Sequence, residues 1–185
     1  MPYNALEQII RAIENDPVNL LFQALYGMDL NYARRFDDAI AVLTKVLAVS
    51  PNEPVAISTL RSAYHNDKQF DRAYEVFVQS YETQGDTDAV MALKEGYKMG
   101  GYEAAMISLA TFLTKRSETR YVTPFRIATL YARAGKIDEA NHYLSLAYDE
   151  HDPNMPYIAI DPIFDPLKNS REFQALVTIM NFPKN

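Results

Sequence analysis

The chain repeats a short residue pattern with a period near 34 positions. Four strings run from an apolar or aromatic residue, through an acidic and a variable residue, to an alanine at Ala39, Ala73, Ala105 and Ala140. These alanines are 34, 32 and 35 residues apart, and Ala5 lies 34 residues before the first of them. A large apolar residue stands four positions after each alanine, at Ile9, Leu43, Phe77, Leu109 and Leu144. Such a period predicts a stack of helical hairpins with these side chains in the core.

Each period divides into two segments that favour helices. The first segments span 20–35, 55–66, 89–99 and 124–134, and each alanine string opens the second. Acidic pairs such as Asp37-Asp38 and Asp138-Glu139 stand in the first turn of a second helix, where carboxylates suit the helix dipole. Gly100-Gly101 and Gly135 mark tight turns between the paired helices. The pattern therefore predicts an all-α fold of antiparallel helix hairpins.

The first segments resemble the first helix of the tetratricopeptide repeat (TPR) family, which has Leu-Gly and then Tyr three residues after the Gly. Here this signature reads Tyr26-Gly27 then Leu30, Leu60-Arg61 then Tyr64, Ala92-Leu93 then Gly96, and Ile127-Ala128 then Tyr131. The early Trp of the family is replaced by Gln23, Ile57, Ala89 and Pro124. The resemblance covers residues 1 to about 154. It implies a right-handed superhelical solenoid that binds a protein or peptide in its concave groove.

The sequence predicts three parts. Residues 1–17 form a half repeat with a second helix only, 18–154 form four hairpins, and 155–185 form a Pro-containing tail with a capping helix. In the half repeat, one apolar face carries Leu6, Ile9, Ile10 and Ile13, and no first helix precedes it. Two interpretations stay open. Either the chain was cut from a longer protein, which we favour, or this face makes a homodimer contact.

The tail carries its own helix signals. Asn169-Ser170 offers an N-cap, and a single apolar stripe follows at Phe173, Leu176, Val177 and Met180. The string over 157–167, with 171–176 after it, resembles the tail that closes repeat arrays in some bacterial signalling proteins. Those proteins place a winged-helix or nucleotide-cyclase domain before the repeats. The resemblance implies a bacterial protein in which this chain is one module.

The composition excludes several classes of function. The chain has no Cys, which rules out disulfides, thiolate zinc sites and cysteine nucleophiles. Its net charge of −6 argues against direct nucleic-acid binding through a broad basic surface. No apolar run approaches the roughly 18 residues of a membrane span, and the N-terminus lacks the features of a signal peptide. We therefore expect a cytoplasmic protein that does not bind membranes.

No catalytic motif is present, and His65, His142 and His151 occupy different positions in the period. The acidic cluster around His151 resembles a metal site. However, it occupies the position at which each repeat ends its second helix in a polar turn, as at 15–17. We interpret it as a turn, and we expect no enzyme activity, no metal and no cofactor.

The predicted binding residues lie on the first helices, which line the concave side of such a solenoid. They are Asn31, Tyr32, Ser62, His65, Asn66, Lys94, Tyr97, Lys98, Thr129 and Arg133. Lys94, Lys98 and Arg133 give this face a basic end that suits an acidic peptide or a carboxylate terminus. The alternative is that these cations are solvated charges on exposed helices.

The function that we expect is a protein-binding scaffold module within a larger bacterial protein. One alternative is a ligand-responsive regulatory domain of a transcriptional regulator or nucleotide cyclase. Another is a self-associating repeat protein that uses its N-terminal helix.

Overall fold

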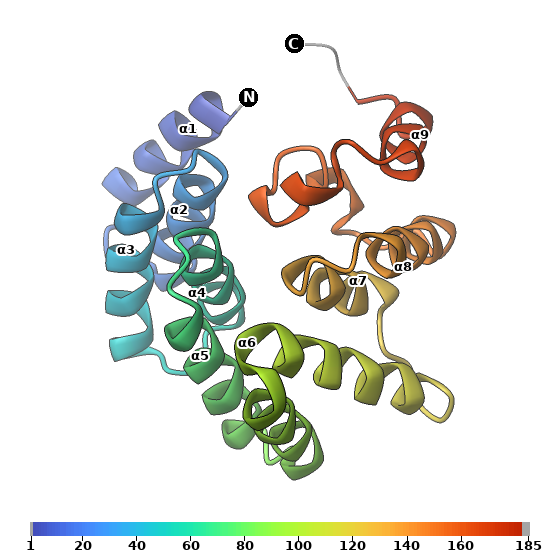
Figure 1. Cartoon of the computed structure of the whole chain (residues 1–185). Coiled ribbons are helices and arrows are strands. Elements are labelled where there is room, and N and C mark those ends of the chain that lie inside the picture. Colours follow the sequence, from blue (N-terminus) through green and yellow to red (C-terminus); the bar gives the residue numbers. More distant parts are fainter. Residues whose placement is uncertain (1, 183–185) are drawn as a thin grey trace. The chain divides into compact units, whose positions relative to one another are not determined.

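The computed structural model describes residues 2–182, with side chains from Ala5 onward, and every regular element in that range is helical (Figure 1). The α-helices are α1 (Pro2–Asn15), α2 (Leu20–Tyr32), α3 (Phe36–Val49), α4 (Pro54–Asn66), α5 (Phe70–Thr83), α6 (Thr87–Ser117), α7 (Pro124–Arg133), α8 (Ile137–Asp149) and α9 (Arg171–Ile179). Two 3-10 helices, η1 (Met155–Tyr157) and η2 (Pro162–Leu167), lie between α8 and α9. The all-α prediction is confirmed. None of these helices is long and apolar enough to cross a membrane.

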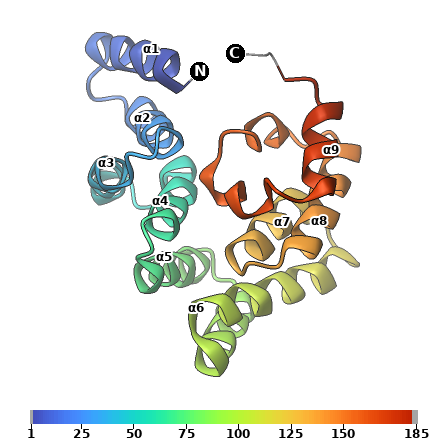
Figure 2. The ribbon, with the colours of Figure 1, turned by 45° about the horizontal axis from the view of Figure 1, so that its top comes forward.

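The chain forms two compact units that divide after Gln84. In the first unit each of α1 to α4 packs against the following helix, and α2 also packs against α4 (Figure 2). In the second unit α7 packs against α6 and α8, and the tail elements η1, η2 and α9 pack against this pair. The sequence pattern did not predict a division at this point.

The turns inside the hairpins repeat with the period. A residue with positive φ stands between the paired helices at Arg34, Lys68, Gly101 and Gly135. Their spacings of 34, 33 and 34 residues differ from those of the alanines by at most one residue. Such left-handed residues end helices by turning the chain back on itself. The turns predicted at Gly100-Gly101 and Gly135 are therefore confirmed, and Arg34 and Lys68 adopt the same backbone without glycine.

The phased alanines differ in burial. Ala39, Ala73, Ala105 and Ala140 are fully buried, whereas Ala5 is exposed. Ala5 lies on α1, which follows no other helix in this structure. Of the apolar face predicted for this helix, Ile10 is 41% exposed, Ile9 and Ile13 are half-buried, and Leu6 is buried.

The tail completes a hydrophobic core with α7 and α8. Its buried members include Ile158, Phe164, Leu167, Phe173 and Leu176, which pack with the alanines and Leu144 of the hairpin. Ser170 caps α9 by accepting a hydrogen bond from the Phe173 amide at 3.2 Å, as predicted. The tail is thus part of the core of the second unit.

Candidate interaction surface

In the first unit, α2 and α4 bring two of the predicted binding residues into contact. The Asn66 side-chain amide donates to Oδ1 of Asn31 at 3.1 Å. The two residues are 35 positions apart, so this bond joins nearly equivalent places in consecutive periods. Asn31 is only 1% exposed and Asn66 is half-buried. Asn31 therefore supports the surface from below, because a partner can reach Asn66 but not Asn31.

Three further predicted residues lie on the same two helices. The His65 ring is half-buried and lies 5.6 Å from the Phe70 ring, centroid to centroid. The Ser62 hydroxyl is buried and donates to the Ser58 carbonyl at 3.4 Å. Tyr32 is half-buried. We call Tyr32, His65 and Asn66 the first-helix surface, since these are the predicted residues of this unit that retain substantial exposure.

In the second unit, the predicted residues separate by exposure. Lys94 and Lys98 are exposed on α6 and four residues apart, so they share one side of that helix. Tyr97, next to them, is half-buried. Thr129 of α7 donates its hydroxyl to the Arg126 carbonyl at 2.8 Å. Lys94 and Lys98 are thus the exposed charged residues of this group.

Arg133 does not lie on an open surface, which corrects its predicted place beside Lys94 and Lys98. It is 8% exposed, and its Nη1 donates to the Thr129 carbonyl at 3.0 Å. Tyr102 and the Asp161 carboxylate lie close enough to act on its charge. The tail covers Arg133 because η2 packs on α7, and the repeat period carries no information about that contact.

Opposing effects act on the pKa of Asp161, the N-cap residue of η2. Burial raises the pKa of the Asp161 carboxyl, while the Ile163 amide, which donates to it at 3.0 Å, and the nearby Arg133 charge act to lower it. Arg133 keeps its proton at neutral pH despite burial, because guanidinium groups remain charged in proteins. The attraction between the two charges is one of several effects at this place, and we assign Arg133 a structural role because it is buried.

The acidic cluster after α8 forms the predicted turn. His151 adopts a positive φ of 57°, and the Asp152 carboxylate accepts hydrogen bonds from the Asn154 amide at 2.8 Å and from the Thr123 hydroxyl. The Asp152 carboxylate is therefore hydrogen-bonded to other groups of the protein. No group of three or more His, Asp or Glu side chains among the described residues is arranged to hold a metal ion.

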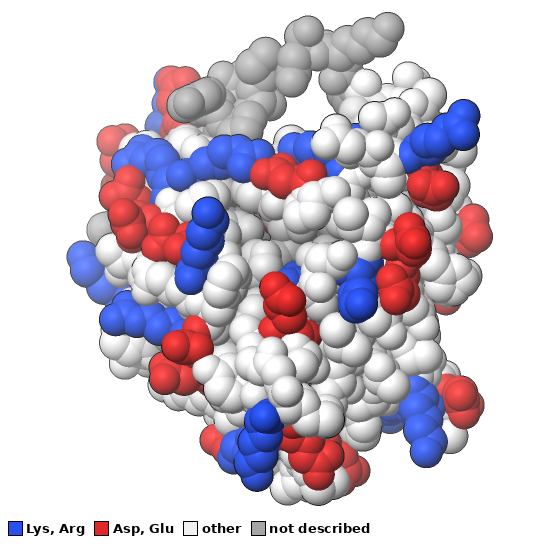
Figure 3. All heavy atoms as spheres, in the orientation of Figure 1, with Lys and Arg blue, Asp and Glu red and all other residues white. Residues whose placement is uncertain are grey.

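The charged side chains on the face drawn in Figure 3 are interspersed, with basic and acidic groups alternating among uncharged ones. A broad basic field of the kind that binds nucleic acid is not visible on that face. Comparisons of the sequence with models of known protein families, with curated proteins and with solved structures find no match.

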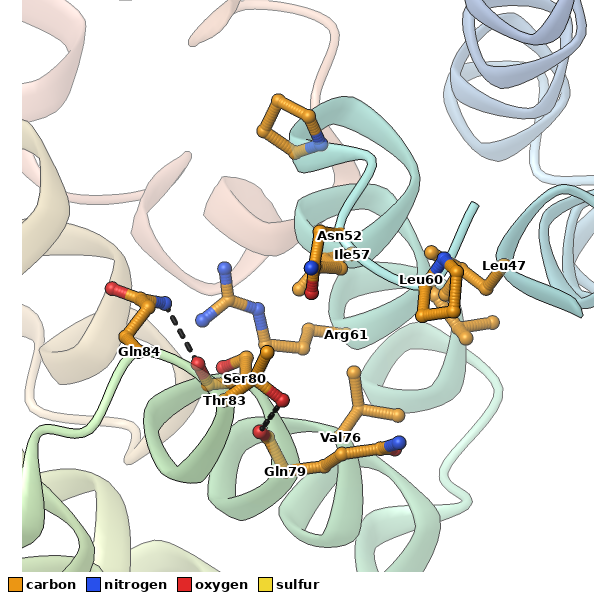
Figure 4. Close-up of a pocket in the computed structure, with 12 residues that line it drawn as sticks. Leu47, Asn52, Ile57, Leu60, Arg61, Val76, Gln79, Ser80, Thr83 and Gln84 are labelled. Atoms are coloured by element: carbon orange, nitrogen blue, oxygen red, sulfur yellow. Dashed lines mark hydrogen bonds between the residues drawn. The ribbon is translucent and has the colours of Figure 1, made fainter. Parts of the chain in front are cut away.

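A pocket between α4 and α5 was not predicted (Figure 4). It holds about 490 Å³ and is lined by residues of α4 and α5, Arg61 among them, by Leu47 of α3 and by the loops beside these helices. The sequence does contain a signal for it. Arg61 occupies the position of the repeat signature at which the other first helices carry Gly27, Leu93 and Ala128. A charged residue at this otherwise uncharged position was the feature of the sequence from which a pocket could have been predicted.

Proposed function

We propose that the chain is a helical repeat protein of the TPR type that binds a partner protein or peptide. Its support lies in features that recur with the period: buried alanines, left-handed turn residues, and side-chain caps before α2, α4 and α6. Helices that repeat in this way and pack on their neighbours build an extended surface rather than an enclosed active site. In the proposal the hairpins form a right-handed solenoid.

The observation that carries the proposal is the hydrogen bond between Asn31 and Asn66. It joins two helices that also pack against each other, α2 and α4, at positions one residue away from exact equivalence in the 34-residue period. Tyr32 and His65 stand at the ends of these same helices and are partly exposed. A partner that meets this face contacts side chains from two hairpins at once, which is how repeat proteins gain binding area.

The chemistry of the partner follows from the charges that remain exposed. With Arg133 buried, Lys94 and Lys98 are the accessible cations among the predicted binding residues. Two lysines on one helix side favour an acidic segment of the partner. Such exposed pairs contribute mainly to association rate and specificity, so we expect the partner's binding to weaken as salt increases.

Affinity capture with the full chain tests the proposal. We expect the wild type to retain a partner that the double variant Tyr32→Ala, His65→Ala loses. The matched control carries Lys45→Ala and Glu75→Ala, which change exposed residues of α3 and α5. Circular dichroism checks that all three proteins are equally folded. Capture of the same partner by both variants contradicts the assigned surface, and absence of any partner together with substrate turnover contradicts the function.

A further inference from the structure

The hairpin that α6 forms has an open groove along one face. Its halves, residues 87–99 and 101–117, meet at the break in the helical backbone at Gly100 and Gly101. A groove of about 580 Å³ runs between the two halves, and all of its lining residues belong to α6. Met91 and Met99 line this groove and are 55% and 76% exposed. Large apolar side chains with so much exposed area mark a surface that a partner can cover.

The groove arises from side chains of two sizes. A Cβ atom added to Gly96 would lie 2.6 Å from the Ala104 carbonyl oxygen, so the two halves approach each other very closely there. The small lining residues are Ala92, Ala104 and Ser108, and the large apolar ones are Met91, Met99, Ile107 and Phe112. The small side chains leave the space between the larger ones unfilled, and this space is the groove.

Contacts within the hairpin hold one end of the groove in place. The Arg116 guanidinium carbon lies 4.2 Å from the centroid of the Phe112 ring. The same guanidinium donates from Nη2 to Oδ1 of Asp86 at 2.7 Å, which ties the end of the hairpin to its beginning. Phe112 is therefore positioned before a partner arrives, and a preorganised contact lowers the free-energy cost of binding.

The first unit shows which kind of segment fills the space beside paired helices in this protein. There α2 and α3 form a hairpin, and α4 packs against both of them. Helices pack in this way because rows of side chains on one helix fit between the rows on another. On the α6 hairpin, Met91 and Met99 supply flexible, unbranched walls that adapt to such a helix. The shape of the groove therefore fits an α-helix with an apolar stripe.

The charges of the lining indicate which residues flank that stripe. Asp88 and Glu95 are exposed lining residues, and neither carboxylate forms a hydrogen bond or ion pair with another described residue. They are seven residues apart, which is about 10.5 Å along a helix. Lys115 is the one cation of the lining, and Lys94 and Lys98 do not line the groove. The excess of carboxylates favours a basic partner.

We propose that this groove binds an amphipathic α-helix of a partner protein that carries Lys or Arg beside its apolar stripe. The stripe contacts Met91, Met99 and Phe112, and the basic residues pair with Asp88 and Glu95. The groove contains no residue of the first-helix surface. The proposal therefore goes beyond the function assigned to that surface, and each of the two can fail without the other.

The test uses the full chain and designed 14-residue helical peptides as probes. The basic probe is the sequence Ala-Leu-Lys-Gln-Leu-Leu-Lys repeated twice, acetylated and amidated, and its acidic counterpart has Glu at every Lys. Binding is followed by ¹H–¹⁵N NMR shifts. We expect the basic probe to shift amides of α6 with a Kd of about 100 μM or tighter, and the acidic probe to bind at least about tenfold more weakly. A basic probe with Pro as its eighth residue should lose binding, because Pro breaks the helix.

Charge reversal separates the groove from general attraction to an acidic protein. We expect Glu95→Lys to weaken the basic probe by about tenfold or more and to strengthen the acidic probe. Glu103→Lys is the matched control, because Glu103 is also an exposed carboxylate of α6 but does not line the groove. It makes the same change in net charge and should alter either affinity by less than about threefold. Thermal melting checks that both variants fold.

The apolar walls have their own variant. We expect the double variant Met91→Ser, Met99→Ser to weaken the basic probe by about tenfold or more, because it removes both methionine side chains from the groove. Val49→Ser is the control, at an apolar residue of α3 that is 72% exposed and lies outside the groove. It should leave the affinity for the probe unchanged.

Several outcomes overturn the proposal. They are equal affinity for the basic and acidic probes, unchanged affinity in a folded Glu95→Lys variant, shifts confined to elements other than α6, and absence of shifts with the basic probe at about 1 mM. Light scattering tests the other occupant, a second copy of this chain. A wild-type dimer that becomes a monomer in the double methionine variant shows that a second copy covers the groove, which also overturns the proposal. We expect the wild type to be monomeric.

Discussion

Alanines at equivalent positions of the repeat differ in their environment. Ala73 stands at the crossing of α5 with its neighbours and is fully buried, whereas Ala5 is exposed on α1. Replacing Ala73 by Arg forces a long charged side chain into a packed crossing. We expect Ala73→Arg to lower the free energy of unfolding by more than about 3 kcal/mol, measured by urea denaturation.

Ala5→Arg is the control for that substitution, because it makes the same chemical change at the equivalent position of α1, where the alanine is exposed. We expect its unfolding midpoint to stay at that of the wild type, within the roughly 0.5 kcal/mol typical of surface changes. Equal losses in the two variants contradict the assignment of the phased alanines to helix crossings.

Residue-level prediction worked where the period dictates the environment and failed where the tail intervenes. The burial of Ala39, Ala73, Ala105 and Ala140 follows from their phase. Arg133 has the phase of a groove residue, yet η2 covers it. Its environment is set by a segment that breaks the period, and no local pattern encodes which helix that segment will cover.

At the scale of an element, α6 shows how two predicted helices become one hairpin. The helical backbone is interrupted at Gly100 and Gly101, as the sequence predicted for this turn. Gly101 has φ 70° and ψ −153°, a region that only glycine adopts readily, while Gly100 has φ −169° and is extended. We expect Gly101→Ala to destabilise the chain by about 1–3 kcal/mol in urea denaturation.

Gly100→Ala is the matched neighbour. Its backbone accepts any residue, and the added Cβ meets only the Ala104 Cβ at 3.1 Å, a tight contact that a small shift relieves. We expect it to cost clearly less than Gly101→Ala. A larger loss in Gly100→Ala argues that the sharp turn does not depend on the left-handed residue.

An ion pair between Asp86 and Arg116 joins the two ends of α6. Asp86 caps the first turn by accepting from the Ala89 amide at 3.2 Å, and Arg116 near the last turn donates from Nη2 to the Asp86 Oδ1 at 2.7 Å. Both side chains are largely buried, at 17% and 13% exposed. The hydrogen bonds from Arg116 hold the pKa of Asp86 below its ordinary value of 3.8, with burial opposing them.

Because folding lowers this pKa, the ion pair stabilises the chain above pH 3.8, and its contribution is lost as pH falls through the lower pKa of the folded state. Asp86→Asn keeps a capping oxygen but removes the charge. We expect it to cost about 1–2 kcal/mol at pH 7. The difference between wild type and variant should shrink in acid below pH 3.8, as followed by urea denaturation across pH. A difference that stays constant with pH contradicts the role of the charge.

At the scale of the whole molecule, repetition explains the hairpins but not where the chain divides into compact units. The alanine strings continue on both sides of Gln84, and the interval that contains it, from Ala73 to Ala105, differs from the others only in being 32 residues long. The pocket beside Arg61 could not be predicted from the period either. The sequence shows that Arg61 is unusual at its position, but the pocket itself depends on how α4 and α5 pack in the folded chain.

The final prediction concerns the independence of the two units. Phe164 of η2 is fully buried in the core that the tail shares with α7 and α8, so Phe164→Ala leaves a cavity at a cost of about 3–5 kcal/mol. Hydrogen exchange should show the loss of protection in α7, α8 and α9, while α2, α3 and α4 keep theirs, since partial unfolding follows compact units. Ile160→Ala, at a residue 39% exposed, is the control and should leave both regions protected. Equal loss of protection on both sides of Gln84 in Phe164→Ala means that the chain unfolds as one cooperative body, in which case the division is one of geometry and not of stability.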